Sequence, residues 1–386
     1  MRKLVFCIAI ILCLGLIVPV AGGCSETEED EDNRFLELLG LLPAKAKEIG
    51  CFNLIDYKKI RQDNGLSLYN SQGQKVSRED FITTFINILE DNDIAGGEAL
   101  TLSSYYSGWG RYILESHIQD KYVGYDLTNI DAEINTLNKP PELIIGAIGR
   151  FDPQATKTAL SNRDEWPSWA KEIYSSEEYF NIEINSWGDG SIEHLNTRLS
   201  PPHLDQVGRA PTLAVSEEYL FLGISTDIIK SMIDASMNNI SSLADIPEYA
   251  LAAEGIYDLG AYGAIIGDES LVNGYPSYNE YDEGPRLNKF LTFGTGIGRD
   301  GRGNYIALVL VHDNPSDAEE NVSLLKQRIN ENFIKSDGRN WSYSYYIYDT
   351  EIYAKGNALL AKLYTDNETL WSSWFFNRWA LVLHEQ

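Results

Sequence analysis

The sequence predicts an α+β protein of two domains, each built on a mostly antiparallel sheet with helices packed on one face. Three observations lead to this class. The chain has 386 residues, of which 44% are hydrophobic and 23% charged, a globular composition in a chain longer than one core usually spans. Apolar and aromatic runs of strand length recur along it between helix-like stretches. One order of elements occurs twice, which suggests a structural duplication.

The N-terminus has the three-part layout of a secretory signal peptide. Two basic residues are followed by an uncharged run of 17 residues, and three small residues then precede Cys24. These last residues resemble a bacterial lipobox, in which the cysteine becomes diacylglycerol-modified. Residue 21 is Ala, whereas lipoboxes usually have Leu at this place. The resemblance implies a signal peptide over residues 1–23 and a lipidated Cys24 at the start of the mature chain.

Two other fates of this segment remain open, an uncleaved anchor helix and plain secretion. A run of 17 residues is at the short edge of what spans a bilayer, and Pro19 with Gly22 and Gly23 suits a helix end badly. The two or three acyl chains of a lipoprotein hold it durably on a membrane. We therefore expect an extracytoplasmic place in the cell envelope, with the membrane as a partner through Cys24.

Residues 24–33 form the predicted tether. Six of the nine residues after Cys24 are acidic, so the run cannot pack into a core and extends by self-repulsion. At about 3.3 Å per residue it spans roughly 30 Å, which clears the lipid headgroups. A calcium site is the alternative, but the run lacks the glycine turn and the ligand spacing of an EF-hand loop.

The first domain is expected over residues 34–255. A helix ends at Pro43, and a capping-box pattern at 77–80 opens another. The Asp152-Pro153 pair opens a third, since proline suits a first helical turn. Further helices begin at Thr226 and near Asp245. The predicted strands are 51–56, 99–106, 111–115, 122–125, 143–151, 180–186, 212–215 and 219–224.

The second domain is expected over residues 256–386. It opens with a long loop at 267–287, and Asn314-Pro315 begins a helix through residue 333 in the same way as Asp152-Pro153. The predicted strands are 291–293, 305–312, 341–348 and 358–364. Both copies therefore follow the order β-α-β-β-α, starting from strands 143–151 and 305–312. An aromatic segment follows at 370–376.

Part of the mature chain resembles uncharacterised bacterial envelope proteins built from paired α+β modules. The similar features are a strand that ends in Phe151-Asp152 before a helix, and the segment 214–225 that leads into a second helix. The resemblance covers residues 140–250. It implies no activity and no site residues.

The charge and the cysteines exclude several functions. A formal charge of −26 repels nucleic-acid phosphate, so we expect no DNA or RNA partner. Anionic lipid headgroups would be repelled as well, so attachment must come from the lipid on Cys24. The mature chain keeps only Cys24 and Cys51, and lipidation of Cys24 leaves Cys51 without a partner for an internal disulfide. Cys51 lies in an apolar stretch and is expected to be a buried apolar residue, not a reactive thiol.

No motif in the sequence predicts a catalytic residue, a cofactor or a metal. Gly296 to Gly301 match GxGxxG, but strands are predicted on both sides, so Asp300-Gly301 is expected to be a hairpin turn and not a dinucleotide site. No P-loop, HExxH or GxSxG motif occurs. Glu193 with His194, and His203 with Asp205, lie in one predicted loop and could ligate a metal, but their spacing matches no known metal motif.

Aromatic residues supply the predicted ligand contacts. Trp166 and Trp169 flank a proline in a polar stretch, where they could stack on a sugar or peptide. Trp371, Trp374 and Trp379 fall at helical spacing and are expected in a core. The alternative for every one of them is ordinary packing, since aromatic side chains belong on strand faces and in cores.

These observations predict a non-catalytic, lipid-anchored binding or assembly protein that contacts a protein or polymer of the envelope. The basis is the anchor, the tether and the lack of catalytic motifs. A solute-binding lipoprotein of a transporter is the first alternative and would need a cleft. An extracytoplasmic hydrolase is the second and would need paired carboxylates in one cleft.

Overall fold

A computed structural model describes part of the chain, and the described residues all belong to one of two compact units, residues 33–386. The other unit, residues 1–32, contains the predicted signal peptide, Cys24 and nearly all of the tether, which therefore lie outside the described residues. The described residues are 33–67, 76, 77, 80, 81, 83–85, 88, 123–125, 127–136, 144–162, 168–188, 212–269, 286–330, 333, 334 and 340–366.

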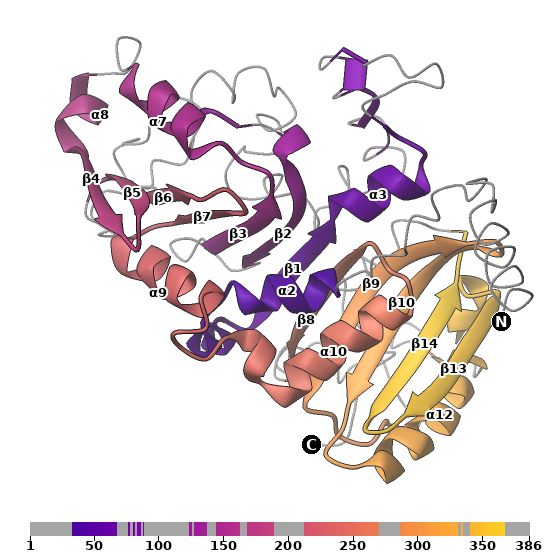
Figure 1. The fold of residues 1–386 in the computed structure, drawn as a ribbon. Coiled ribbons are helices and arrows are strands. Elements are labelled where there is room, and N and C mark those ends of the chain that lie inside the picture. Colours follow the sequence, from indigo (N-terminus) through magenta and orange to yellow (C-terminus); the bar gives the residue numbers. More distant parts are fainter. Residues whose placement is uncertain are drawn as a thin grey trace, which may run out of the picture. The chain divides into compact units, whose positions relative to one another are not determined.

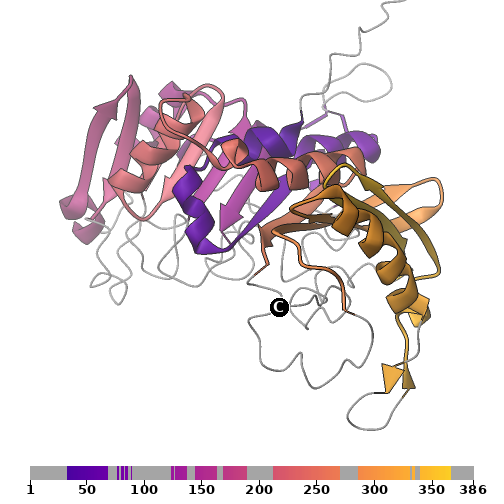
Figure 2. The same ribbon diagram turned by 90° about the horizontal axis from the view of Figure 1, so that it is seen from below.

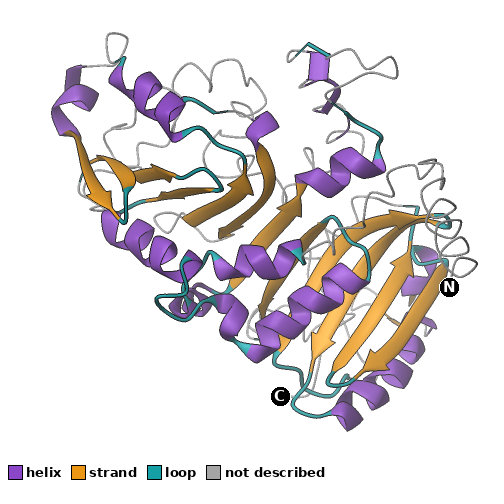
Figure 3. Cartoon of the chain, in the orientation of Figure 1, coloured by secondary structure: helices purple, strands orange, loops and turns teal. Residues whose placement is uncertain are grey.

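The described strands form one twelve-stranded sheet in which every neighbouring pair is antiparallel (Figures 1 and 3). Its order is β13-β14-β10-β9-β8-β1-β2-β3-β7-β6-β5-β4. The strands are β1 (Cys51–Asp56), β2 (Ile130–Thr136), β3 (Ile144–Gly149), β4 (Tyr174–Tyr179), β5 (Ile182–Trp187), β6 (Thr212–Val215), β7 (Tyr219–Gly223), β8 (Gly263–Asp268), β9 (Thr292–Asp300), β10 (Gly303–Val311), β13 (Asp349–Lys355) and β14 (Ala358–Tyr364). The large antiparallel sheet with helices confirms the predicted α+β class.

Helices cover both faces of this sheet, so the prediction of helices on one face is wrong (Figure 2). The helices packed on one face are α2 (Arg34–Gly40), α9 (Thr226–Ser236) and α10 (Pro247–Asp258). Those on the opposite face are α3 (Tyr57–Asp63), α7 (Pro153–Ser161) and α12 (Pro315–Asn330). The reason lies in strands such as β10, which is apolar and buried at every position from Tyr305 to Val311 and so needs cover on both sides.

Shorter elements complete the described part of the chain. They are α8 (Ser168–Ile173), the 3-10 helices η1 (Ala44–Ile49), η2 (Leu127–Asn129), η4 (Leu243–Asp245) and η6 (Tyr343–Tyr345), and the two-stranded β11 (Phe333–Ile334) and β12 (Asn340–Trp341). Among the described residues no helix has both the length and the apolar composition needed to cross a membrane.

The predicted helix starts are confirmed. Asp152 caps α7, because its Oδ1 accepts hydrogen bonds from the amides of residues 154 and 155 at 2.9 and 3.2 Å. Asn314 precedes α12 in the same way, accepting from the Asp317 amide at 3.0 Å. A capping box formed by Ser242 and Asp245 stands just before α10, and Ser77 accepts from the Asp80 amide at 3.1 Å.

Two predicted strands are wrong. Residues 342–348 contain the 3-10 helix η6 instead of a strand, because Ser342 accepts a hydrogen bond from the Ser344 amide at 3.3 Å and turns the backbone. Val123, in the predicted strand 122–125, is helical. The predicted strands 99–106 and 111–115, and the aromatic segment 370–376, lie outside the described residues.

The sheet is continuous across the predicted domain boundary at residue 256. That position falls inside α10, and the next strand, β8, pairs with β1 in a register that includes Asn53 opposite Ile265. Helix α10 also packs on β1, where the rings of Phe52 and Tyr249 lie 6.2 Å apart. Elements from both predicted domains therefore share one sheet and one core on each face.

Candidate functional site

A pocket of about 460 Å³ lies between α3 and the adjoining ends of β2 and β3. This volume lies within the range of small-molecule sites, roughly 300 to 1,000 Å³. The described residues that line it are Lys58, Arg61, Gln62, Leu66, Ser67, Phe81, Thr128, Asp131 and Arg150. We call it the basic pocket, because three of these side chains are cationic and one is anionic.

Helix α3 supplies the basic side chains of one wall. It begins directly after β1, where the Asp56 carboxylate accepts a hydrogen bond from the Lys59 amide at 2.8 Å. Lys58, Arg61 and Gln62 are spaced i, i+3 and i+4, which places them on one face of the helix. The opposite side of α3 packs Tyr57 and Ile60 into the core, and this packing fixes the direction of the basic face.

Asp131 holds two arginines at the floor of the pocket. The Arg61 guanidinium contacts the Asp131 carboxylate and also donates to the Ile130 carbonyl at 2.8 Å. Arg150 follows β3, and its Nε lies 3.9 Å from Asp131 Oδ2. The Arg61 side chain is 10% exposed, whereas that of Arg150 is 74% exposed. Arg61 is thus part of the framework, and Arg150 reaches the open side of the pocket.

The charge of the pocket is opposite to that of the whole chain. Lys58 has no ion pair in the described part of the chain, and the pocket has two more positive than negative groups. Burial lowers the pKa of the Arg61 guanidinium, and the like charge of Arg150 adds to that effect, while Asp131 acts in the opposite direction. An anion placed here would offset the repulsion between the cations.

An apolar wall faces the charged groups. Phe81 lines the pocket, and its ring lies 6.3 Å from that of Phe85 in the core behind it. Arg61 lies over the Phe85 ring, with its Cζ 5.4 Å from the ring centroid. Leu66 adds aliphatic surface after the end of α3. The described lining of the pocket therefore combines cationic and apolar side chains.

A buried carboxyl group lies behind α3. Glu133 on β2 has no exposed surface, and it accepts hydrogen bonds from Tyr57 at 3.3 Å and from Asn135 at 2.9 Å. Burial raises the pKa of Glu133 to about 8. Asn53, opposite Asn135 on β1, is also fully buried, and its side-chain amide has no hydrogen-bond partner among the described residues. The hydrogen bond from Tyr57 to Glu133 ties α3 to β2 of the sheet.

A second pocket, of about 680 Å³, lies among α7, the β4–β5 hairpin and the β6–β7 turn. Its acidic side chains include Glu177, which pairs with Lys230 at 3.0 Å, and Glu183, which pairs with Lys157 at 3.2 Å. The remaining acidic side chains that line it are Asp152, Glu178 and Glu217. This pocket is acidic, like the chain as a whole, so its charge does not indicate a particular ligand.

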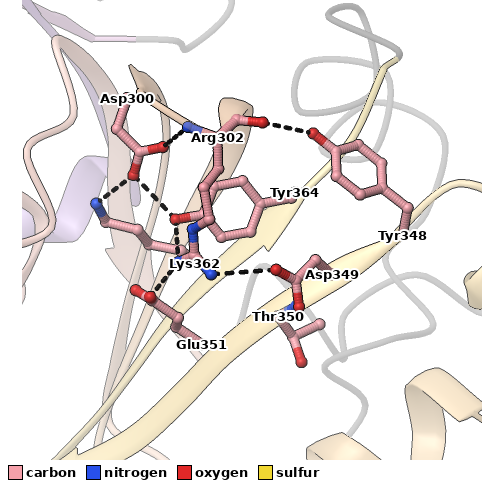
Figure 4. A network of polar contacts seen from close by, with 8 residues as sticks. All are labelled: Asp300, Arg302, Tyr348, Asp349, Thr350, Glu351, Lys362 and Tyr364. Atoms are coloured by element: carbon pink, nitrogen blue, oxygen red, sulfur yellow. Dashed lines mark hydrogen bonds and ion pairs between the residues drawn. The ribbon is translucent and has the colours of Figure 1, made fainter.

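The GxGxxG residues form a hairpin, as predicted, and a polar network fixes it (Figure 4). Asp300 ends β9 and accepts hydrogen bonds from the Arg302 amide at 2.9 Å and from Lys362 at 3.0 Å. Arg302 in turn contacts Asp349 at 3.1 Å, Glu351 and the Tyr364 hydroxyl. These side chains join the turn to β13 and β14, so their role is to stabilise the sheet.

The site residues predicted from the sequence lie outside what the structure describes. Cys24, Trp166 and the group His194, His203 and Asp205 lie outside the described residues. Trp169 is in α8, but its side chain is also outside what the structure describes. Within the described residues no three His, Cys, Asp or Glu side chains lie close enough together to hold a metal ion.

The basic pocket was not predicted from the sequence. A local feature could have indicated it, since three of the four residues from 58 to 61 are basic in a strongly acidic chain. Asp131 and Arg150 have no such feature, because only the register of β2 with β3 brings them to α3.

Comparison with known proteins gives no family. No protein-family model matches the sequence, and no curated protein matches it. Among solved structures the chain is similar to TP0453 in crystal form I, with 11% identity, a TM-score of 0.38, and coverage of 89% of this chain and 98% of that chain. Crystal form III of TP0453 gives 10% identity, a TM-score of 0.37, and coverage of 87% and 96%.

Proposed function

We propose that this protein is a non-catalytic binding protein of the cell envelope, anchored through lipidated Cys24, which takes its ligand in the basic pocket. The observation that supports a binding role is the reversed charge of that pocket. A chain with a formal charge of −26 places Lys58, Arg61 and Arg150 around one cavity of about 460 Å³. A cavity of this size favours a small solute over a polymer, which would need an extended groove.

The anchoring part of the proposal is tested by labelling cells with a fatty-acid probe. Wild-type protein should be labelled, and the Cys24→Ala variant should not be. Cys51→Ala is the matched control, because it removes the other cysteine of the mature chain and should leave labelling unchanged. Equal labelling of the Cys24→Ala variant would contradict lipidation at this residue.

The binding part is tested by cross-linking in intact cells, followed by mass spectrometry of what is recovered with the anchored protein. A small-solute binder should bring down no stoichiometric protein partner. A single partner in constant ratio would instead make this an assembly subunit, and the cross-linked residues would locate the contact surface. Neither result affects the conclusion from fatty-acid labelling of Cys24.

We also infer that the sheet consists of two structural copies. The first copy is α2–β1–β2–β3–α7–β6–β7 and the second is α10–β8–β9–β10–α12–β13–β14. Sheet order is the same in both, β1-β2-β3-β7-β6 and β8-β9-β10-β14-β13, and the leading helices α2 and α10 share one face while α7 and α12 share the other. The antiparallel pairing of β1 with β8 is what a two-fold axis between them would produce.

In this proposal the second copy begins at Pro247 instead of residue 256, and β4, β5 and α8 are an insertion in the first. An experimental structure tests it by superposition. The seven paired elements should overlay after a rotation of about 180° around an axis perpendicular to the sheet. A rotation that moved α10 to the face of α7 would contradict the inference.

A further inference from the structure

We infer that the basic pocket binds a small organic phosphate monoester, with the phosphate between Lys58 and Arg150 and the apolar body against Leu66. This inference names the ligand class of the binding role proposed above and rests on it. It does not depend on the lipid anchor.

The number of charges favours a doubly charged ligand. Among the described lining residues, Lys58, Arg61 and Arg150 outnumber one acidic group, Asp131, which leaves two positive charges uncompensated in this set. A phosphate monoester has a charge of roughly −1.5 to −2 at pH 7, since its second pKa is about 6. A carboxylate has a single negative charge and would leave one cation unpaired.

The geometry leaves donors free for a phosphate. The Asp131 carboxylate contacts Arg61, and Arg61 also donates to the Ile130 carbonyl, so this guanidinium is largely satisfied. Arg150 approaches Asp131 at 3.9 Å, beyond hydrogen-bond distance, and its side chain is 74% exposed. Its N–H groups and the ammonium group of Lys58 are the donors open to a ligand, and guanidinium donors suit the oxygens of a phosphate.

The apolar lining residues indicate the chemistry of the part of the ligand that is not phosphate. Phe81 and Leu66 are the apolar residues that line the pocket, and Phe81 is backed by Phe85. Phe81 is 4% exposed and Leu66 is half-buried, so inorganic phosphate would leave mainly Leu66 in contact with water. A ring or a short alkyl chain would cover it and add the free energy of burying apolar surface.

Isothermal titration calorimetry of the full chain in mild detergent tests the ligand class. The probes are phenyl phosphate, benzoate, benzyl alcohol and inorganic phosphate. Phenyl phosphate should bind most tightly. Benzoate has only one negative charge and inorganic phosphate has no ring, so each should bind about tenfold more weakly. Benzyl alcohol has no charge and should not bind measurably. Affinity for phenyl phosphate should rise between pH 5 and pH 7, as its second ionisation completes. Benzoate binding as tightly as phenyl phosphate would overturn the phosphate assignment.

Two variants locate the site, and a neighbouring lysine is the control. Lys58→Gln and Arg150→Gln should each weaken phenyl phosphate about fivefold to tenfold. Lys59→Gln removes the same charge from the next residue, but Lys59 faces Asp63 at 3.2 Å, outside the pocket, so its affinity should stay within about twofold of wild type. Equal weakening by Lys58→Gln and Lys59→Gln would show a general charge effect and overturn the site.

The outcomes separate this inference from the proposed function. No binding of any probe, in a protein that is labelled at Cys24 and lacks a stoichiometric protein partner, would overturn the ligand class and leave the anchored binding role in place. Probe binding by a protein that is not labelled would keep the pocket and overturn the anchor.

Discussion

Glu133 is a carboxyl group with no exposed surface, and it makes the stability of the protein depend on pH. The group keeps its proton in the folded state up to about pH 8, whereas in the unfolded chain it ionises near pH 4.5. Between these values the unfolded state binds fewer protons than the folded state, so stability falls as pH rises. Below pH 4.5 both states are protonated and the group has no such effect.

The Glu133→Gln variant should therefore be more stable than wild type at neutral pH. Glutamine cannot ionise, its amide oxygen can still accept from Asn135, and its NH2 group can donate to the Tyr57 hydroxyl oxygen. We expect a gain on the order of 3 kcal/mol at pH 7, shrinking toward zero at pH 4.5. Urea unfolding at several pH values measures it. A stability difference that stays constant from pH 4.5 to pH 8 would show that Glu133 does not titrate in this range.

Cys51 is a buried free thiol, which confirms the prediction of an apolar role. Burial raises the pKa of its thiol to about 12, and the thiolate is the reactive form. Iodoacetamide at pH 8 should thus leave Cys51 of the folded protein unmodified for hours and alkylate it within minutes in 6 M guanidinium chloride. Mass spectrometry of the peptide that contains residue 51 reads the result. Rapid alkylation under native conditions would indicate local opening of β1.

At the scale of elements, the β4–β5 hairpin contains a conformational conflict. Its two turn residues, Phe180 and Asn181, have φ values of 49° and 60°, which is the left-handed region that favours Asn or Gly. Phe180 is 53% exposed, and its ring packs on that of Tyr179 with centroids 4.7 Å apart. A large side chain is unfavourable in this conformation by roughly 1 to 2 kcal/mol.

The Phe180→Asn variant should raise stability by about 1 kcal/mol, because the gain in backbone preference exceeds the loss of an exposed ring contact. Phe180→Ala is the control, since it removes the ring but keeps the unfavourable conformation, and it should be no more stable than wild type. The midpoint of urea unfolding measures both. If both variants lose stability equally, the ring contact outweighs the backbone preference at this turn.

Local sequence patterns correctly predicted strands whose formation depends on their own residues. The bounds of β1, β6 and β14 agree with the prediction, because each is a short apolar run. β8 was missed although it is a short apolar run, and its last two residues lie in the predicted loop 267–287. Strands with a mixed pattern were missed as well, and β4 and β13 show why. Their residues are mostly exposed, since both lie at the edges of the sheet and contact it on one side. Their pairing partners, and not their own residues, make them strands.

The candidate site was beyond this kind of reasoning for a related physical reason. Its charged groups come from α3, from the start of β2 and from the residue after β3. Sequence separation between Arg61 and Asp131 is 70 residues, so no local spacing links them. The bulge where Ile130 and Ala132 pair with consecutive residues of β3 leaves Asp131 out of the ladder and beside Arg61. Such a feature depends on strand register, which residue composition does not specify.

At the scale of the whole described unit, the pairing of β1 with β8 couples the two halves of the sheet. Five residue pairs join these strands in register, and on one face the side chains of Phe52 and Tyr249 pack across the junction. Residues from both halves belong to the same core on each face, so neither half has a core that is complete without the other.

Differential scanning calorimetry should accordingly show one unfolding transition. Leu222→Ala in β7 and Leu360→Ala in β14 test the coupling, because each side chain is 1% exposed and they lie in different halves of the sheet. Each substitution should cost about 2 to 5 kcal/mol and lower the midpoint of the same single transition. Two transitions, with each variant lowering a different one, would show instead that the halves unfold independently and that the chain has two domains despite its continuous sheet.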